Sequence, residues 1–136
     1  MKKLFSVLLI CLLAFFFTGC KKKGETGVLF YSHPVTQDNV LHSSQTFEAG
    51  KRIYYLFYSQ KKLKNEFIRV QLFKAADNVP RGGYSVLWAN DHRVMRQNAF
   101  YYYDNFTVYQ SGRYVLQVFS TDDISKPIAW NYFYVK

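Results

Sequence analysis

From Val28 onward, short runs of β-branched and aromatic residues alternate with clusters of turn residues. The runs show period-two alternation of apolar and polar positions, whereas no long run has the 3.6-residue spacing of an amphipathic helix. The pattern therefore predicts an all-β domain. The predicted strands span residues 28–32, 52–59, 66–74, 84–89, 99–109, 113–120 and 128–135, and the strand over 99–109 is either continuous or broken into two.

Seven to eight short strands separated by frequent turns are typical of a β-sandwich, with a small β-barrel as the alternative. The remaining polar stretches predict connections, including residues 36–45, a lysine-rich segment at 60–65 and a turn at Asn90, Asp91 and His92. A domain of this length buries enough apolar surface to form a core without disulfides or metals. We therefore expect one β-domain over residues 28–136.

One local motif narrows the fold. Residues 110–118 read Gln-Ser-Gly-Arg-Tyr-Val-Leu-Gln-Val, and this segment resembles the Gly-x-Tyr start of the penultimate strand in immunoglobulin-like domains. The resemblance implies an immunoglobulin-like β-sandwich in which the Tyr114 hydroxyl bonds back to nearby backbone as a structural corner. Leu116 stands where antibody domains place a cysteine, and the segment 66–74 lacks their tryptophan. The resemblance is thus to immunoglobulin-like domains of the bacterial envelope.

The first twenty residues have the three regions of a secretory signal peptide. A basic start precedes an uncharged apolar run over residues 4–17, which is too short to span a bilayer as a helix. The run ends in Phe17-Thr18-Gly19-Cys20, which resembles the lipobox of bacterial lipoproteins, with Phe17 in place of the usual leucine. The resemblance implies removal of residues 1–19, diacylation of Cys20 and anchoring in a membrane of the cell envelope, on its periplasmic or surface face.

Residues 20–27 then form a charged tether that contains Lys21, Lys22 and Lys23, which add positive charge at the membrane surface. Cys11 leaves with the signal peptide and Cys20 carries lipid, so the mature chain has neither a disulfide nor a thiol nucleophile. An apolar content of 49% with 20% aromatic residues excludes a disordered chain.

Residues suited to catalysis or metal binding are few. The three histidines, His33, His42 and His92, lie in predicted connections, and Asp91 is adjacent to His92 rather than spaced to orient it. The sequence contains no nucleophile elbow, no phosphate-binding glycine loop and no set of residues with the spacing of metal ligands. We therefore expect no enzymatic activity, no metal and no cofactor.

Two features indicate binding. Aromatic residues occupy both faces of the strands 52–59 and 128–135, although a sandwich strand buries only one face. The chain from Val28 also has 13 basic and 8 acidic residues. If the two strands share a sheet, one patch would join aromatic and basic residues: Tyr54, Tyr58, Tyr132, Tyr134, Lys61 and Lys62. Alternatively, cross-strand tyrosine pairs only stabilise the sheet, and the loop lysines are merely solvated.

These features favour a non-enzymatic envelope lipoprotein that binds or scaffolds a protein partner. The alternative is a lipoprotein that binds a small ligand, a lipid or a glycan on an aromatic surface or in a pocket. A flat aromatic face would favour the protein partner, and a pocket ringed by tyrosine and tryptophan would favour the ligand. The positive charge alone would suggest nucleic acid, but an envelope location argues against it.

Overall fold

The computed structural model describes residues 25–76, 83–96 and 100–136, which fold into β-strands without a helix. Seven strands contain six to ten residues, and two further strands, β2 and β6, contain two residues each. The strands are β1 (Thr26–Tyr31), β2 (Thr46–Phe47), β3 (Arg52–Ser59), β4 (Phe67–Ala75), β5 (Tyr84–Arg93), β6 (Met95–Arg96), β7 (Phe100–Thr107), β8 (Gly112–Ser120) and β9 (Ala129–Val135).

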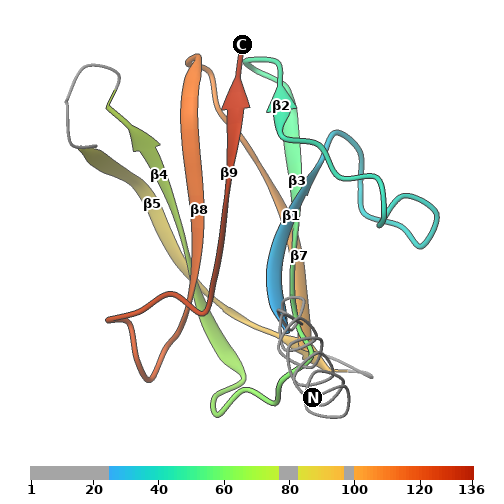
Figure 1. Ribbon diagram of the computed structural model, residues 1–136, viewed down its shortest axis with the longest axis vertical. Helices are drawn as coiled ribbons and strands as arrows, with labels where there is room; N and C mark the ends of the chain where they lie inside the picture. Colours follow the sequence, from blue (N-terminus) through green and yellow to red (C-terminus); the bar gives the residue numbers. More distant parts are fainter. Residues whose placement is uncertain (1–24, 77–82, 97–99) are drawn as a thin grey trace, which may run out of the picture.

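The strands form two sheets that pack face to face (Figure 1). One sheet has four strands in the order β1-β3-β7-β6, and the other has five strands in the order β2-β9-β8-β4-β5. All neighbours are antiparallel except β2 and β9, which pair in parallel. The order β1-β3-β7-β6 is that of one sheet of an immunoglobulin-like sandwich, and β9-β8-β4 is that of the other, with β2 and β5 added at its two edges. The predicted fold is confirmed, and the alternative of a closed barrel is wrong.

The core lies between the inner faces of the two sheets. Along β3, Ile53, Tyr55 and Phe57 are completely or almost completely buried, as the alternation of the sequence predicts. The central ring is that of Phe133 in β9, whose centroid lies 4.8 Å from Phe30. The rings of Phe47, Phe106 and Tyr114 also contact Phe133, at centroid distances of 5.3 to 5.8 Å. Aromatic packing thus holds the two sheets together.

Tyr114 has the geometry of a corner residue. Its side chain is 1% exposed, its ring stacks on Phe133, and its hydroxyl donates a 2.6 Å hydrogen bond to the backbone carbonyl of Gln110. Leu116, two residues further along β8, is completely buried between the sheets. The position that holds a cysteine in antibody domains is therefore a plain apolar core position in this chain.

Some strand boundaries differ from the predicted ones. Strand β1 begins at Thr26, inside the predicted tether, and β5 continues through Asn90, Asp91 and His92, where a turn was predicted. The turn prediction is wrong because pairing with β4 overrides local turn preference: Asp91 lies opposite Arg69, and the two side chains form an ion pair. Such long-range pairing cannot be read from the local sequence.

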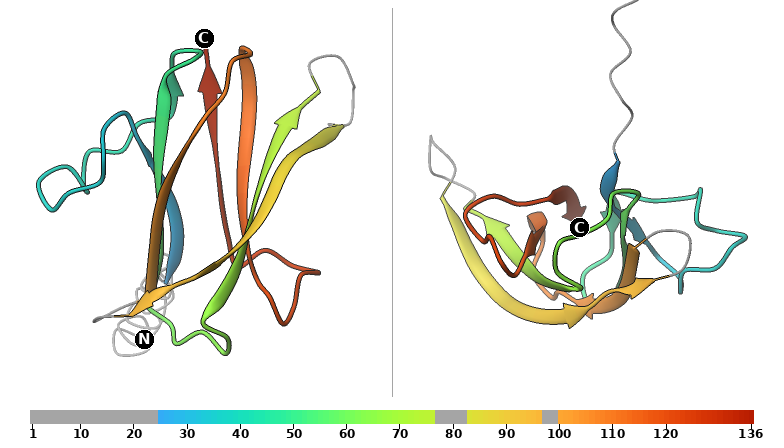
Figure 2. Two further views of the ribbon diagram at one scale, coloured as in Figure 1. Left: turned by 180° about the vertical axis from the view of Figure 1, so that it is seen from behind. Right: turned by 90° about the horizontal axis from the view of Figure 1, so that it is seen from below.

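The two ends of the sandwich carry different connections (Figures 1 and 2). The β1 end, where β1 begins, contains the connections 60–66 and 121–128. The β9 end, where β9 finishes, contains the connections 48–51 and 108–111, which are joined by a hydrogen bond from the Gly50 amide to the Val108 carbonyl. The predicted signal peptide and the lipidation site Cys20 lie outside the described residues.

Candidate interaction surface

The predicted tyrosines all point away from the core, but they do not form one patch. Tyr54 and Tyr58 lie on β3 of the four-stranded sheet, whereas Tyr132 and Tyr134 lie on β9 of the five-stranded sheet. The predicted common patch is therefore wrong. Alternation along a strand determines which residues face outward, but the pairing of distant strands determines the sheet to which each face belongs.

Lys61 and Lys62 follow the end of β3 and lie at the β1 end of the molecule. The Lys61 ammonium forms an ion pair with Glu25. Tyr58 covers Gly27 of β1 so closely that a Cβ atom on Gly27 would lie 2.5 Å from the tyrosine hydroxyl oxygen. Tyr58 therefore packs across the pairing of β1 and β3, against Gly27.

The outer face of the five-stranded sheet carries a continuous apolar row. Tyr132 of β9 lies opposite Val115 of β8, Val115 lies opposite Phe73 of β4, and Phe73 lies opposite Val86 of β5. The row thus crosses four strands without a charged residue. Together with its neighbours it forms a surface that we call the aromatic face: Phe73, Tyr84, Val86, Val115, Trp130, Tyr132 and Tyr134.

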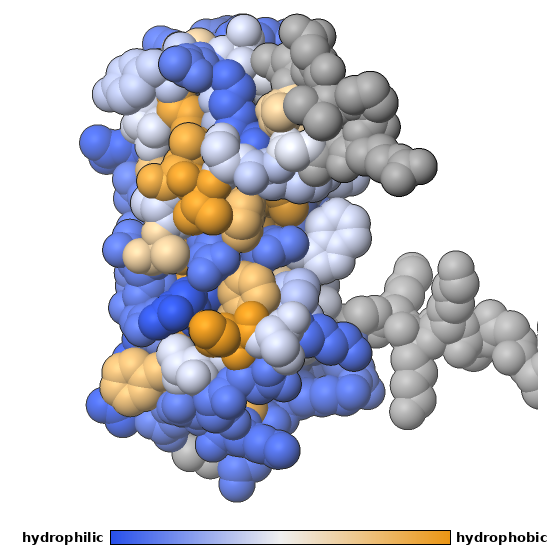
Figure 3. Space-filling view, turned by 90° about the vertical axis from the view of Figure 1, so that its left-hand side faces the viewer, coloured by the Kyte–Doolittle hydropathy of each residue, from blue (hydrophilic) through white to orange (hydrophobic). Residues whose placement is uncertain are grey.

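Several side chains of the aromatic face are strongly exposed. Trp130 is 58% exposed, Val86 57% and Tyr84 51%, and the rings of Tyr132 and Tyr134 form an edge-to-face pair with centroids 5.8 Å apart. A hollow of about 250 Å³ lies on this surface and is lined by Phe73, Tyr84, Val115, Gln117 and Trp130. Figure 3, which views the side of the molecule where β5 lies, shows hydrophobic side chains clustered between hydrophilic ones.

Sequence reasoning identified only the β9 part of the aromatic face. Phe73 and Val115 were missed, although each directly follows an inward-facing residue of its strand and must therefore point outward. Val86 could not be read in this way, because it lies two residues from the inward-facing Trp88 and a register shift in the pairing of β4 with β5 turns it outward. Pairing of β4 with β8 and of β8 with β9 was needed to bring these positions together.

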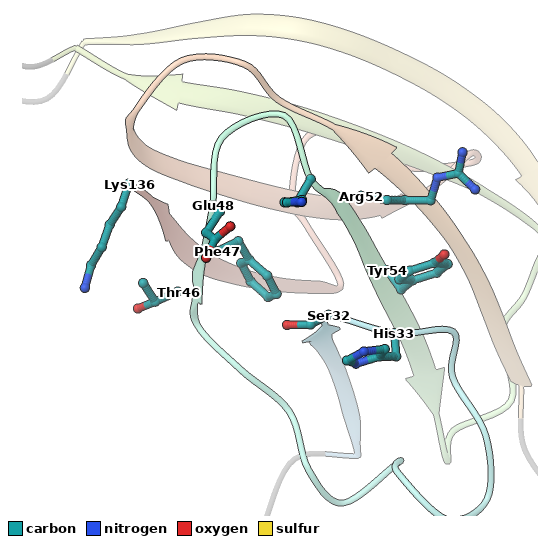
Figure 4. Close-up of a pocket in the computed structure, with 9 residues that line it drawn as sticks. Ser32, His33, Thr46, Phe47, Glu48, Arg52, Tyr54 and Lys136 are labelled. Atoms are coloured by element: carbon teal, nitrogen blue, oxygen red, sulfur yellow. The ribbon is translucent and has the colours of Figure 1, made fainter.

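A larger hollow of about 560 Å³ lies at the β9 end, where Phe47, Glu48, Tyr54 and Ser32 form part of its lining (Figure 4). The side chains of Arg52 and Lys136 belong to the same lining but extend to opposite sides in Figure 4. These two cations therefore do not converge on a single small anion.

A hydrogen-bonded chain of three titratable residues joins the two sheets between β5 and β7. The Tyr102 hydroxyl lies 2.8 Å from His92 Nδ1 and donates to Asp104 Oδ2 at 3.0 Å, and the Tyr102 and His92 rings are stacked. Burial, together with the carboxylate of Asp104, raises the pKa of Tyr102 well above its ordinary value. Tyr102 therefore stays protonated and acts as a structural donor rather than as a base.

Asp91, the neighbour of His92, does not orient the imidazole. Both carboxylate oxygens of Asp91 accept hydrogen bonds from Arg69, at 2.7 and 3.0 Å. The hydrogen bond from Arg69 is the main cause that lowers the pKa of Asp91.

Among the described residues, no group of three or more His, Cys, Asp and Glu side chains could hold a metal ion. That part of the chain also contains no helix with the length and apolar character needed to cross a membrane.

No family model matches the chain, and no curated protein matches it. The solved structures that match the chain include the following two. The alkylpurine DNA glycosylase AlkC of Pseudomonas fluorescens, bound to DNA containing an abasic site analogue, is 12% identical with a TM-score of 0.47 over 90% of this chain and 33% of that chain. A β-glucosidase from Listeria innocua in complex with gluconolactone is 11% identical with a TM-score of 0.40 over 83% of this chain and 16% of that chain.

Proposed function

We propose that this protein is a non-enzymatic lipoprotein of the bacterial cell envelope that binds a protein partner through the aromatic face. The resemblance of residues 17–20 to a lipobox supports anchoring through Cys20. The observation that carries the binding role is the uncharged row from Tyr132 to Val86, which crosses four strands and borders the strongly exposed Trp130 and Tyr84. Extended exposed apolar patches on soluble domains mark interaction sites.

A protein partner fits this surface better than a small ligand. The hollow on the aromatic face measures about 250 Å³, which is below the range of roughly 300 to 1,000 Å³ for ligand pockets. Tyrosine, tryptophan and arginine dominate the energetics of protein interfaces, and Arg113 lies opposite Tyr134 at the border of the aromatic face. A face of this composition with so small a hollow favours docking of another protein surface.

The proposal is tested by crosslinking in native membranes. The full-length, affinity-tagged protein is crosslinked to its neighbours and purified in detergent, and captured proteins are identified by mass spectrometry. The variant Trp130→Ser/Tyr132→Ser/Tyr134→Ser should lose a partner that the wild-type protein captures. Because all three side chains are exposed, thermal unfolding should change little.

The matched control is Tyr101→Ser/Tyr103→Ser on β7 of the other sheet, where the two rings stack at a centroid distance of 6.4 Å. This control should retain the partner. The proposal is contradicted if the β9 variant keeps every partner, or if both variants lose the same one. Strong destabilisation of the β9 variant would also contradict it, because it would show that these aromatics pack against the domain itself.

A further inference from the structure

Positive charge gathers at the β9 end of the sandwich. Five basic residues lie there against one acidic residue, Glu48, in the described part of that end: Lys51, Arg52, Lys74, Arg113 and Lys136. None of the five forms an ion pair with a residue that the structure describes. All except Lys74 are exposed to solvent. Repulsion among these five side chains is therefore reduced by water and salt, and an acidic partner would reduce it further.

The opposite, β1 end is nearly balanced. Its four lysines, Lys61, Lys62, Lys64 and Lys126, are accompanied by Glu25, Asp122 and Asp123 in the lining of one hollow. Glu25 pairs with Lys61, and the charges of Lys126 and Lys64 contribute to the lowered pKa of Asp123, after its hydrogen bonds with Ser125. Among the described residues, basic side chains thus exceed acidic ones by less at this end than at the β9 end.

The cations of the β9 end are arranged for a broad surface rather than a small ion. Arg52 and Lys136 point to opposite sides of the hollow between them (Figure 4). Arg113 lies opposite Tyr134 and donates a long, 3.4 Å hydrogen bond to the Tyr84 hydroxyl. The charged end is therefore continuous with the aromatic face. An occupant must carry acidic groups and also apolar side chains, and protein segments combine both.

We infer that the partner presents an acidic protein segment, which docks across the β9 end and the adjoining part of the aromatic face. The inference rests on the proposed function, because it specifies the chemistry of the partner that the aromatic face binds. Acidic side chains of the segment lie against Lys51, Arg113 and Lys136, and its apolar side chains contact Tyr134 and Tyr84. An acidic glycan or an anionic lipid would use the same cations without needing the aromatic residues.

The test uses the full-length protein in detergent and a fluorescent random copolymer of glutamate and tyrosine as the probe, with binding followed by anisotropy. In about 0.1 M salt, where charge interactions extend over only about 10 Å, the variant Lys51→Glu/Arg113→Glu/Lys136→Glu should raise the dissociation constant by at least about tenfold. The matched control Lys62→Glu/Lys64→Glu/Lys126→Glu changes the net charge by the same amount at the β1 end. It should raise the constant by less than about threefold, because screening confines the effect to nearby charges.

Equal losses in the two variants would overturn the inference, because they would show attraction to net charge alone. So would a β9-end variant that binds the copolymer as the wild-type protein does. Heparin and vesicles of phosphatidylglycerol serve as competing probes, and selective binding of either one in preference to the copolymer would replace the protein segment by a glycan or a lipid. The variant Trp130→Ser/Tyr132→Ser/Tyr134→Ser distinguishes the two proposals. If it binds the copolymer normally while the β9-end variant does not, binding by the aromatic face is contradicted and the acidic character of the partner is supported.

Discussion

Removing the Tyr114 hydroxyl tests the corner on which the immunoglobulin-like assignment first depended. Tyr114→Phe deletes one oxygen from a side chain that is 1% exposed and leaves the ring stacked on Phe133. The lost interaction is the 2.6 Å hydrogen bond to the Gln110 carbonyl. A buried hydrogen bond contributes about 1 kcal/mol net, and leaving a partner unsatisfied raises the cost of its removal to roughly 1 to 3 kcal/mol.

The lower half of that range is expected, because Gln110 itself is exposed and water can reach its carbonyl after the substitution. Urea unfolding followed by tryptophan fluorescence measures the effect. With a slope of about 1 to 3 kcal/mol per molar urea, a loss of about 1.5 kcal/mol lowers the midpoint by roughly 0.5 to 1.5 M. The slope itself should not change, because the fold is retained.

Tyr109→Phe is the matched control, since this nearby tyrosine is 79% exposed and its ring makes no contribution to the core cluster. Its unfolding midpoint should equal that of the wild-type protein. If Tyr114→Phe also leaves the midpoint unchanged, the hydroxyl does not stabilise the corner and the physical argument for it is refuted.

Three further substitutions test the core, one ion pair and the anchor. Phe133→Ala should lower the free energy of unfolding by about 3 to 5 kcal/mol, because four aromatic rings contact that side chain; a loss below about 1.5 kcal/mol in urea unfolding would contradict this. Arg69 lowers the pKa of Asp91, so their pair stabilises the fold above the unfolded carboxyl pKa of about 3.9 and the gain is lost as pH falls through the folded value. Asp91→Asn should therefore cost at most about 1 kcal/mol at pH 7, and this cost should shrink as the pH falls below about 3.9, measured as the unfolding midpoint against pH. Cys20→Ser should yield an unprocessed or soluble protein in membrane fractionation, and retention in the membrane with normal cleavage would contradict lipidation.

Salt should weaken binding by the cations of the β9 end but not binding by the aromatic face. Contacts of the cations at the β9 end weaken as ionic strength rises, because exposed charges beyond about 10 Å are screened at 0.1 M salt. Burial of the aromatic face has no such dependence. Titrations at two salt concentrations therefore separate the contribution of Lys51 and Arg113 from that of Trp130 and Tyr132.

The sequence by itself determined the fold class and the orientation of individual side chains. Alternation along residues 52–59 predicted that Ile53, Tyr55 and Phe57 point inward and that Tyr54 and Tyr58 point outward, and the burial pattern of β3 confirms it. Alternation is a local property of extended backbone, because successive side chains of a strand must point to opposite faces. A short window of sequence is sufficient to read it.

Only the tertiary structure decided which outward faces share a surface. Tyr58 and Tyr134 have the same orientation in their strands but lie on opposite sheets, and Tyr132 instead joins Phe73 and Val86 through Val115. Pairing between strands far apart in the chain depends on the packing of the entire core, and no short segment encodes it. The aromatic face and the cationic β9 end are products of that pairing.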